Sequence, residues 1–202
     1  MYNNNGTPVL KDASFIHCRI AEQLYLRSNS SASCVNSVIQ NPYPSSSTTS
    51  NFEFINCVIV IDRHHSLRSV TSSSFKNCIF RSVYTSDYVS GSSTAYNCVG
   101  LGSTSMFRDV TNATNKIVSD YASLFKTYTG ANLDFLDSEN FQLTDAAKTQ
   151  YLGTDGTEVG IYGGNLPFDP TPSNPQITKC NVAAKSTADG KLSVDIEVNA
   201  AE

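Results

Sequence analysis

The sequence predicts an all-β solenoid of short parallel strands, with one coil for each copy of a repeated pattern. The first observation is the pattern itself, Phe-x-Asn-Cys-x-Ile in its clearest copy at residues 54–59. The second is its period, because the five copies begin at residues 15, 34, 54, 75 and 95, which are 19, 20, 21 and 20 residues apart. A near-constant period is typical of coils that stack on their neighbours. The third is composition, since copies this short and this rich in Val, Ile, Phe, Ser, Thr and Asn disfavour a helical repeat.

Each copy predicts a coil with a bend in its middle. In the third copy, Phe54, Cys57 and Ile59 carry the apolar signal. Cys57 and Ile59 follow the strand period of two, whereas Phe54 is one residue out of phase with Cys57. A bend at residues 55–56 lets all three side chains point inward, and Asn suits it because Asn tolerates left-handed backbone angles. The equivalent positions predict a ladder of amides that begins with a histidine: His17, Asn36, Asn56, Asn77 and Asn97.

After residue 100 the pattern weakens. The apolar pairs at 117–118 and 124–125 are strand candidates. Residues 153–164, Gly-Thr-Asp-Gly-Thr-Glu-Val-Gly-Ile-Tyr-Gly-Gly, contain five glycines that suit tight turns around one last strand at 159–162. We do not favour a phosphate-binding loop there, because the run lacks a Gly-Lys-Ser/Thr ending and no helix-forming stretch follows it.

The C-terminal part has a different composition. Prolines at positions 167, 170, 172 and 175 predict an extended linker. Residues 176–182 and 191–198 predict two strands joined as a β-hairpin through residues 188–190. We therefore expect a parallel solenoid of about five to seven coils over residues 1–166. The linker and the hairpin then occupy residues 167–202.

The six cysteines raise the question of disulfides. Cys18, Cys57, Cys78 and Cys98 share one position of the repeat, which Ser37 fills in the second copy. Because Ser is nearly isosteric with Cys, the position works without a bridge. Neighbouring coils bring these Cα atoms within about 5 Å, but side chains in register on parallel strands rarely reach the torsion of a disulfide. We favour free thiols, and the absence of CxxC or His-x-x-x-His spacing gives no indication of a metal site.

Length and charge narrow the function classes. A chain of 202 residues is long enough for one sizeable core, and a net charge of −4 with a pI near 5.3 disfavours nucleic-acid binding. The longest strongly apolar run, residues 57–61, is far shorter than the roughly 20 residues that cross a bilayer. Residues 1–6 are polar and resemble neither a signal peptide nor an anchor. We expect that a leader was removed or that the chain was excised from a longer protein.

Two segments resemble a known class of proteins. The Asn-Cys copies over residues 15–100 resemble the coils of a right-handed parallel β-helix of the pectin-lyase-like class. The ending over residues 141–170, Phe-x-Leu-Thr followed by the glycine-rich run and Pro-Phe, resembles the closing coils of secreted β-helix proteins from polysaccharide-foraging gut bacteria. The resemblance implies an extracellular or cell-surface location and an association with complex carbohydrates.

The enzymes of this class provide a check. The resemblance implies that a lyase would place acidic Ca²⁺ ligands on neighbouring coils beside an Arg or Lys base. A polygalacturonase would carry Asn-Thr-Asp, Asp-Asp, Gly-His-Gly and Arg-Ile-Lys. None of these four motifs is present, and no two adjacent copies place acids at the same offset. The enzyme alternative therefore stays open, with an active site on coils that precede this chain, because the fold alone neither supplies nor excludes an activity.

One lateral strip is a candidate binding site. Four aromatic side chains follow the Cys/Ser position by six or seven residues in consecutive coils, and two charged residues adjoin the third: Tyr25, Tyr43, Asp62, Arg63, His64 and Tyr84. His65 and Arg68 are close in sequence. Stacked rings with polar neighbours suit a sugar, whose C–H groups pack on ring faces and whose hydroxyls bind polar groups. The competing interpretation is a solvated loop whose aromatic side chains cover the edge of the coils.

Two function classes follow. We expect a non-catalytic extracytoplasmic or cell-surface module, structural or glycan-binding, without a metal or a cofactor. The alternative is a polysaccharide lyase or glycoside hydrolase that acts on pectin-like acidic glycans, with Ca²⁺ only in the lyase case. The sequence assigns no catalytic residue, and it names neither the glycan nor the oligomeric state.

Overall fold

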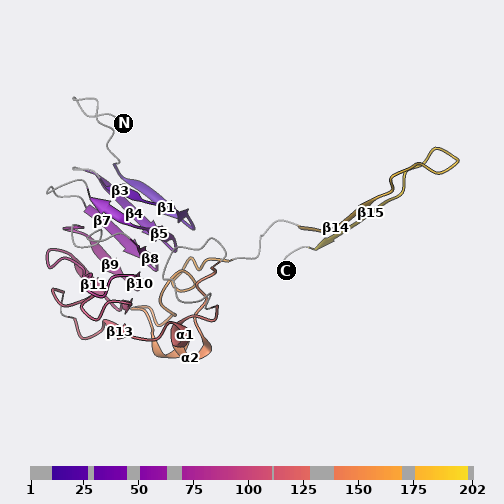
Figure 1. Cartoon of the computed structure of the whole chain (residues 1–202). Coiled ribbons are helices and arrows are strands. Elements are labelled where there is room, and N and C mark those ends of the chain that lie inside the picture. The colour runs from indigo at the N-terminus through magenta and orange to yellow at the C-terminus, as the bar shows by residue number, and fades with distance from the viewer. Residues whose placement is uncertain are drawn as a thin grey trace, which may run out of the picture. The chain divides into compact units, whose positions relative to one another are not determined.

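The computed structural model describes residues 11–26, 30–44, 51–62, 70–110, 112–127, 139–169 and 176–199. Within these residues the regular structure is almost entirely β, with parallel strands stacked coil on coil (Figure 1). The described helices are two short ones, α1 (Tyr121–Leu124) and α2 (Asp145–Gln150). The all-β parallel solenoid predicted from the repeat is therefore confirmed.

Two long parallel sheets and one short one form the coils. Sheet 1 has five strands in the order β1 (Ala13–Ile16), β4 (Ser31–Val35), β7 (Asn51–Ile55), β9 (Ser74–Lys76) and β11 (Thr94–Tyr96). Sheet 2 has six strands in the order β2 (Arg19–Ile20), β5 (Val38–Gln40), β8 (Val58–Ile61), β10 (Ile79–Ser82), β12 (Val99–Leu101) and β13 (Lys116–Val118). Sheet 3 pairs β3 (Leu24–Leu26) with β6 (Pro42–Pro44).

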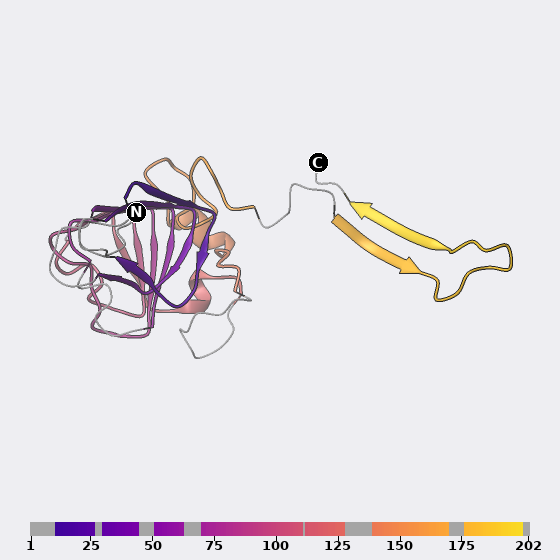
Figure 2. The same cartoon turned by 90° about the horizontal axis from the view of Figure 1, so that it is seen from above.

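Each coil contributes one strand to sheet 1 and the next strand to sheet 2. Figure 2 looks along the stack, where successive coils superpose. Because the chain visits sheet 1 five times, it completes four turns between β1 and β11. The five strands of sheet 1 contain the first positions of the five sequence copies, so the repeat predicted the coils and their order.

The predicted bend separates the two sheets in every coil. His17, Asn36, Asn56, Asn77 and Asn97 have φ angles of 53°, 45°, 51°, 56° and 50°, all in the left-handed region. Asn adopts this region more readily than most residues that carry a Cβ. The bend restores the inward direction after the phase slip, and Phe54, Cys57 and Ile59 are all fully buried in one core cluster.

The interior of the coils is filled by aligned side chains. The rings of Phe54 and Phe75 stack with centroids 5.0 Å apart and planes 5° apart, and Phe80 meets Phe75 edge-on at 5.1 Å. Stacked and edge-on aromatic pairs add to the stabilisation by apolar burial alone. In the fourth copy, Phe80 points into this core and Ile79 points to the other side of sheet 2.

The cysteine position is a column of hydrogen-bond donors. All described cysteines are free, as favoured from the sequence. The Cys57 thiol lies 3.2 Å from the Cys34 carbonyl oxygen on the preceding coil and 3.3 Å from the Ile55 oxygen. The Ser37 hydroxyl makes the same two kinds of contact, to Phe15 and to the carbonyl two residues back. The slot therefore accepts Cys or Ser because both are small and donate a hydrogen bond.

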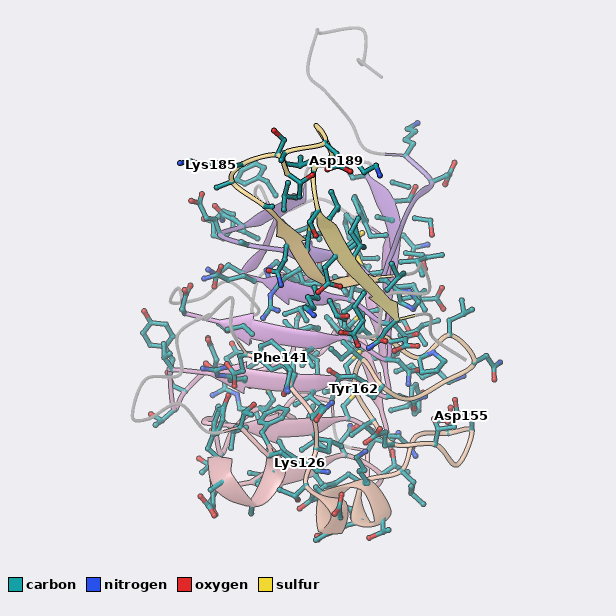
Figure 3. The ribbon with its side chains drawn as sticks, turned by 90° about the vertical axis from the view of Figure 1, so that its right-hand side faces the viewer. Lys126, Phe141, Asp155, Tyr162, Lys185 and Asp189 are labelled. Carbon is teal, nitrogen blue, oxygen red and sulfur yellow. The ribbon has the colours of Figure 1, made fainter. Side chains whose placement is uncertain are left out.

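The outer face of sheet 2 is covered by the segment that follows the last coil. Helices α1 and α2 and residues 139–168 lie on one side of the coils (Figure 2). Figure 3 faces this segment, with Phe141, Asp155 and Tyr162 labelled along it. Side chains of the sheet and of the segment form a second apolar cluster: Val38, Val58, Val60, Ile79, Val99, Leu101, Val118, Tyr121, Leu124, Phe125, Phe141, Leu143, Ala147, Val159 and Ile161.

The asparagine ladder holds this segment in place. The Asn36 amide donates to the carbonyls of Ile161 and Gly163, both at 2.8 Å, and the Asn97 amide donates to Leu152 at 3.0 Å. The backbone N–H of Thr154 donates to Asn77 Oδ1 at 2.9 Å. The glycine-rich run therefore lies along the ladder, and the described rung-to-rung amide contact is the 3.3 Å bond from Asn77 to Asn56.

Two sequence-based expectations beyond the coils are wrong. Residues 159–162 form turns rather than a last strand, because Gly160 has φ of +85° and the segment bonds to side chains of the ladder. Residues 124–125 are not a strand, because Leu124 ends α1, whose first turn is capped by the Asp120 carboxylate. The expectation at 117–118 is confirmed, since both residues belong to β13.

The chain divides into two compact units, Met1–Phe168 and Asp169–Glu202. In the second, β14 (Gln176–Val182) and β15 (Val194–Asn199) pair as an antiparallel hairpin. Gly190, at the predicted connection, has φ of +79° and donates its N–H to Thr187. The predicted C-terminal hairpin is confirmed, with its second strand starting at Val194.

Candidate functional site

Two tyrosines of the predicted lateral strip form an exposed aromatic pair. Tyr25 of β3 and Tyr43 of β6 are register partners on adjacent parallel strands. Their ring centroids are 5.7 Å apart with planes 30° apart, and the two residues are 49% and 37% exposed. Leu24, the neighbour of Tyr25, is buried in the core. Sheet 3 therefore presents a small aromatic platform to solvent, because alternate residues of a strand point to opposite faces.

Asp62 lies in a polar ladder of the same lateral region. Its carboxylate accepts hydrogen bonds from the Gln40 amide at 2.5 Å and from the Asn41 amide, and its N–H donates to Asn41 Oδ1 at 3.0 Å. The Asn41 amide also donates to the Glu22 carbonyl at 3.0 Å. Both carboxylate oxygens are therefore held by side chains of the preceding coil, which makes Asp62 an acceptor between coils.

The structure places Tyr84 against this ladder. The Tyr84 hydroxyl donates to the backbone oxygen of Asp62 at 3.2 Å. The other two residues assigned to the strip, Arg63 and His64, lie outside the described residues, as do His65 and Arg68. The structure thus pairs Tyr25 with Tyr43 and Tyr84 with Asp62.

The outer face of sheet 1 is a second exposed surface, which the sequence reasoning did not single out. Polar side chains lie in register along it at Ser14, Ser33, Glu53, Ser74 and Thr94. A shallow depression of about 280 Å³ crosses its first three strands. Asp12 and Glu53 supply carboxyl groups to its lining. The signal was present in the sequence, because outward strand positions can be read from the alternation once the inward ones are known.

A buried charged cluster lies under the covering segment. Arg81 of β10 and Glu139 form an ion pair in which the two side chains are 1% and 0% exposed. The Tyr121 hydroxyl donates to the other Glu139 oxygen, and the Arg81 guanidinium lies 4.8 Å from the Tyr121 ring centroid. Arg19 donates to the Glu139 backbone oxygen at 2.8 Å.

Burial raises the pKa of the Glu139 carboxyl, and the nearby Arg81 opposes that shift. The cluster joins sheet 2 to its cover and is shielded from solvent, so its geometry indicates a structural contact. Sequence reasoning missed this cluster. The available signal was an arginine directly after the apolar pair at 79–80 of a repeated strand.

Within the described residues, no three or more His, Cys, Asp or Glu side chains gather as a set of metal ligands. Among the same residues, no helix is both long and apolar enough to span a membrane. The carboxyl groups at Asp12, Glu53 and Asp62 are instead distributed over two different surfaces.

Comparison with known proteins gives no relative from which a function could be transferred. No protein family, no curated protein and no solved structure matches the chain.

Proposed function

We propose that this chain is a non-catalytic extracellular or cell-surface module that binds a glycan through the lateral aromatic strip. One observation carries the proposal: Tyr25 and Tyr43 stack in the open on adjacent coils, 5.7 Å apart. Exposed aromatic pairs that cover no core are uncommon on a soluble surface and are typical of contact sites. The resemblance to secreted β-helix proteins supports the same class of ligand and the same location.

The geometry of the coils suits an extended polysaccharide. Adjacent parallel strands are about 4.8 Å apart. That spacing is close to the rise of one sugar in an extended chain, so successive sugars can meet successive coils. The tyrosine rings offer apolar surface to sugar C–H groups, while hydroxyls can bind polar groups such as the exposed Glu22 carboxylate. A site of two rings predicts weak binding, strengthened when many copies sit on one surface.

Glycan-array screening followed by calorimetry with the best oligosaccharide tests this proposal. We expect Tyr25→Ala with Tyr43→Ala to reduce the affinity by tenfold or more, since both rings of the platform are removed. The matched control is Tyr96→Ala, because Tyr96 is 48% exposed but lies on β11 of sheet 1. Binding that survives the double variant, or that is lost in the control alone, would overturn the proposal.

The second candidate is a polysaccharide lyase or glycoside hydrolase, and the depression on sheet 1 favours it. Hydrolysis needs two positioned carboxyl groups, which Asp12 and Glu53 could supply there. β-Elimination from a uronate needs a base and a cation, and Ca²⁺ bound to the same acids would serve as that cation. We expect no release of reducing ends or unsaturated products from pectin or polygalacturonate, with or without Ca²⁺. Product formation that Glu53→Gln abolishes would establish the enzyme and reject the binding module.

A further inference from the structure

The C-terminal hairpin has one apolar face and one polar face. On β15, Val194, Ile196 and Val198 point to one side, and their neighbours Asp195, Glu197 and Asn199 point to the other. Because register partners share a face, the pairing extends this division to β14. The apolar face then consists of Val182 and Val194, Cys180 and Ile196, and Ile177 and Val198.

An irregularity in the pairing preserves the apolar face along its whole length. The register shifts between Ile177 and Lys179, which leaves Thr178 as an extra residue in β14. Without that shift, Ile177 would follow Lys179 onto the polar face, since residues two apart point the same way. A bulge of this kind moves every side chain beyond it to the opposite face. The hairpin therefore keeps all its apolar strand residues together.

The charged and polar side chains of the other face find partners within the hairpin. The Lys179 ammonium lies 2.6 Å from the Asp195 carboxylate, and the Thr178 hydroxyl donates to the Glu197 carbonyl at 3.3 Å. Lys179 and Glu197 are also register partners of opposite charge. This face needs no further layer.

Within the hairpin's own unit, no described residue covers the apolar face. Ile177, Val182, Val194, Ile196 and Val198 are 64%, 56%, 51%, 53% and 52% exposed, and Cys180 is the exposed thiol among the described cysteines. A two-stranded hairpin is at best marginally stable in water unless a further layer covers its apolar side. A row of exposed Ile and Val on free strand edges also promotes association with other chains.

The composition of the face indicates which kind of layer fits. It contains no charged residue and no aromatic anchor, and its side chains are of similar size. Such a surface suits sheet-on-sheet packing, in which two twisted sheets interdigitate about 10 Å apart. The apolar face suits a groove-filling partner less well, because such contacts centre on Trp, Tyr or Arg side chains.

We propose that the apolar hairpin face is a dimerisation surface, on which the hairpin of a second copy of this chain packs face to face. A second copy carries an identical twisted two-stranded face, so the contact closes by two-fold symmetry. Covering the six residues of both copies removes on the order of 1,000 Å² from water, which reaches the lower limit of a specific interface. The association is therefore of moderate strength and depends on concentration.

Sedimentation velocity of the full chain, from about 1 to 200 μM, tests the surface. We expect a monomer–dimer equilibrium in the wild type and at least a tenfold weaker association in Ile196→Lys. The matched control is Asn181→Lys, which adds the same charge on the polar face opposite Asp195 and should associate as the wild type does.

Each other outcome overturns the proposal. A wild type that stays monomeric at the highest concentration rejects it. Protection of the hairpin amides from exchange in that monomer would show that another surface covers the face. A dimer that persists in Ile196→Lys uses a different interface, and association that grows without limit uses the strand edges. Loss of glycan binding in the tyrosine variants leaves this test unaffected, because the two sets of residues belong to different units.

Discussion

Sheet 1 and sheet 2 are built by the same coils, yet the outer face of sheet 2 is buried under a further segment and that of sheet 1 is not. The outer face of sheet 2 carries Val38, Val58, Ile79 and Val99, and all four are buried beneath the segment after residue 120. The outer face of sheet 1 lies at the surface instead, with an exposed carboxylate at Glu53 and an exposed ring at Tyr96. The inward side chains of both sheets belong to one continuous core. The inward positions thus form the coil, and the outward positions decide which face receives a second layer.

The difference can be seen in the strand patterns. Strand β7 alternates between exposed and buried residues, whereas all four residues of β8 are buried. A strand with one solvated face alternates in polarity, and a strand covered on both faces has a continuous apolar run. The continuous apolar run at 58–61 therefore encodes the cover as well as the coil.

The largest expected effect concerns the fit between the cover and the ladder. A Cβ added at Gly163 would lie 1.6 Å from the Glu158 carbonyl oxygen and 2.8 Å from the Asn56 amide nitrogen. We expect Gly163→Ala to lower the free energy of unfolding by about 3 kcal/mol, because the backbone of the segment must shift off the ladder. Urea unfolding followed by circular dichroism measures the change.

A second glycine of the same run is the matched control. Gly156 has φ of +79°, and no atom lies within 4 Å of an added Cβ. Gly156→Ala should therefore lose only about 1 kcal/mol, from the left-handed backbone alone. Equal losses in the two variants would show that the cover does not pack on the ladder as described.

The next effect separates the two outer faces directly. Val58→Ala removes two buried methyl groups between sheet 2 and its cover and should lower the free energy of unfolding by about 2 kcal/mol. Ser74→Ala, at a half-buried outward position of sheet 1, should change it by less than about 0.5 kcal/mol. Chemical denaturation of both variants checks the pair. A costly Ser74→Ala would indicate that sheet 1 also supports a hidden layer.

The sequence predicted the coils well because the repeat is local. Phe54, Cys57 and Ile59 have a spacing that requires a bend, and Asn56 is the residue that makes the bend inexpensive. Five copies of that arrangement leave one way to stack them. The hairpin was equally predictable from the sequence, since Gly190 and the flanking Val and Ile residues mark its turn and strands.

The cover and the buried ion pair could not be predicted in the same way. Residues 152–163 bind the ladder through backbone carbonyls and N–H groups, and such contacts leave no mark in side-chain polarity. The pairing of Arg81 with Glu139 joins residues 58 positions apart, which no local period relates. The lateral strip was only partly predictable from the sequence. The repeat register placed Tyr25 against Tyr43. It gave no sign that side chains of the preceding coil hold the Asp62 carboxylate.

A smaller effect tests the cysteine column inside the core. Cys57→Ala should lower the free energy of unfolding by about 1–2 kcal/mol, through lost packing and a lost donor to the Cys34 carbonyl. Cys57→Ser keeps the donor, as Ser37 does in its own coil, and should lose less than about 1 kcal/mol. A serine variant less stable than the alanine variant would contradict the donor role.

Thiol titration gives an independent measure of the buried thiols. Burial raises the pKa of the Cys34 thiol to about 12 and raises those of Cys57 and Cys98 as well. Because the thiolate is the reactive form, these groups should stay silent at pH 8 while the exposed Cys180 reacts. All six cysteines of the chain should react after denaturation. A shortfall in the denatured protein, restored by reduction, would reveal disulfides.

The smallest effect concerns the rim of the cover, where Asp155 holds its own loop. Its carboxylate accepts a hydrogen bond from the Thr157 hydroxyl at 2.7 Å and another from the Thr157 N–H at 3.0 Å. These bonds favour the charged form and lower the pKa of Asp155.

The lowered pKa makes the stability of the protein depend on pH. A carboxyl group whose pKa is lower in the folded state stabilises the fold above its unfolded pKa, near 4. That contribution is lost as the pH falls through the folded pKa. Buried Glu139 behaves oppositely, because its raised pKa makes its contribution decline as the pH rises. Asp155→Asn should therefore be less stable than the wild type at pH 6, and the difference should shrink as the pH falls through the folded pKa of Asp155. Urea midpoints measured across that range decide the matter, and a difference that stays constant with pH would show that the Asp155 charge makes no contribution.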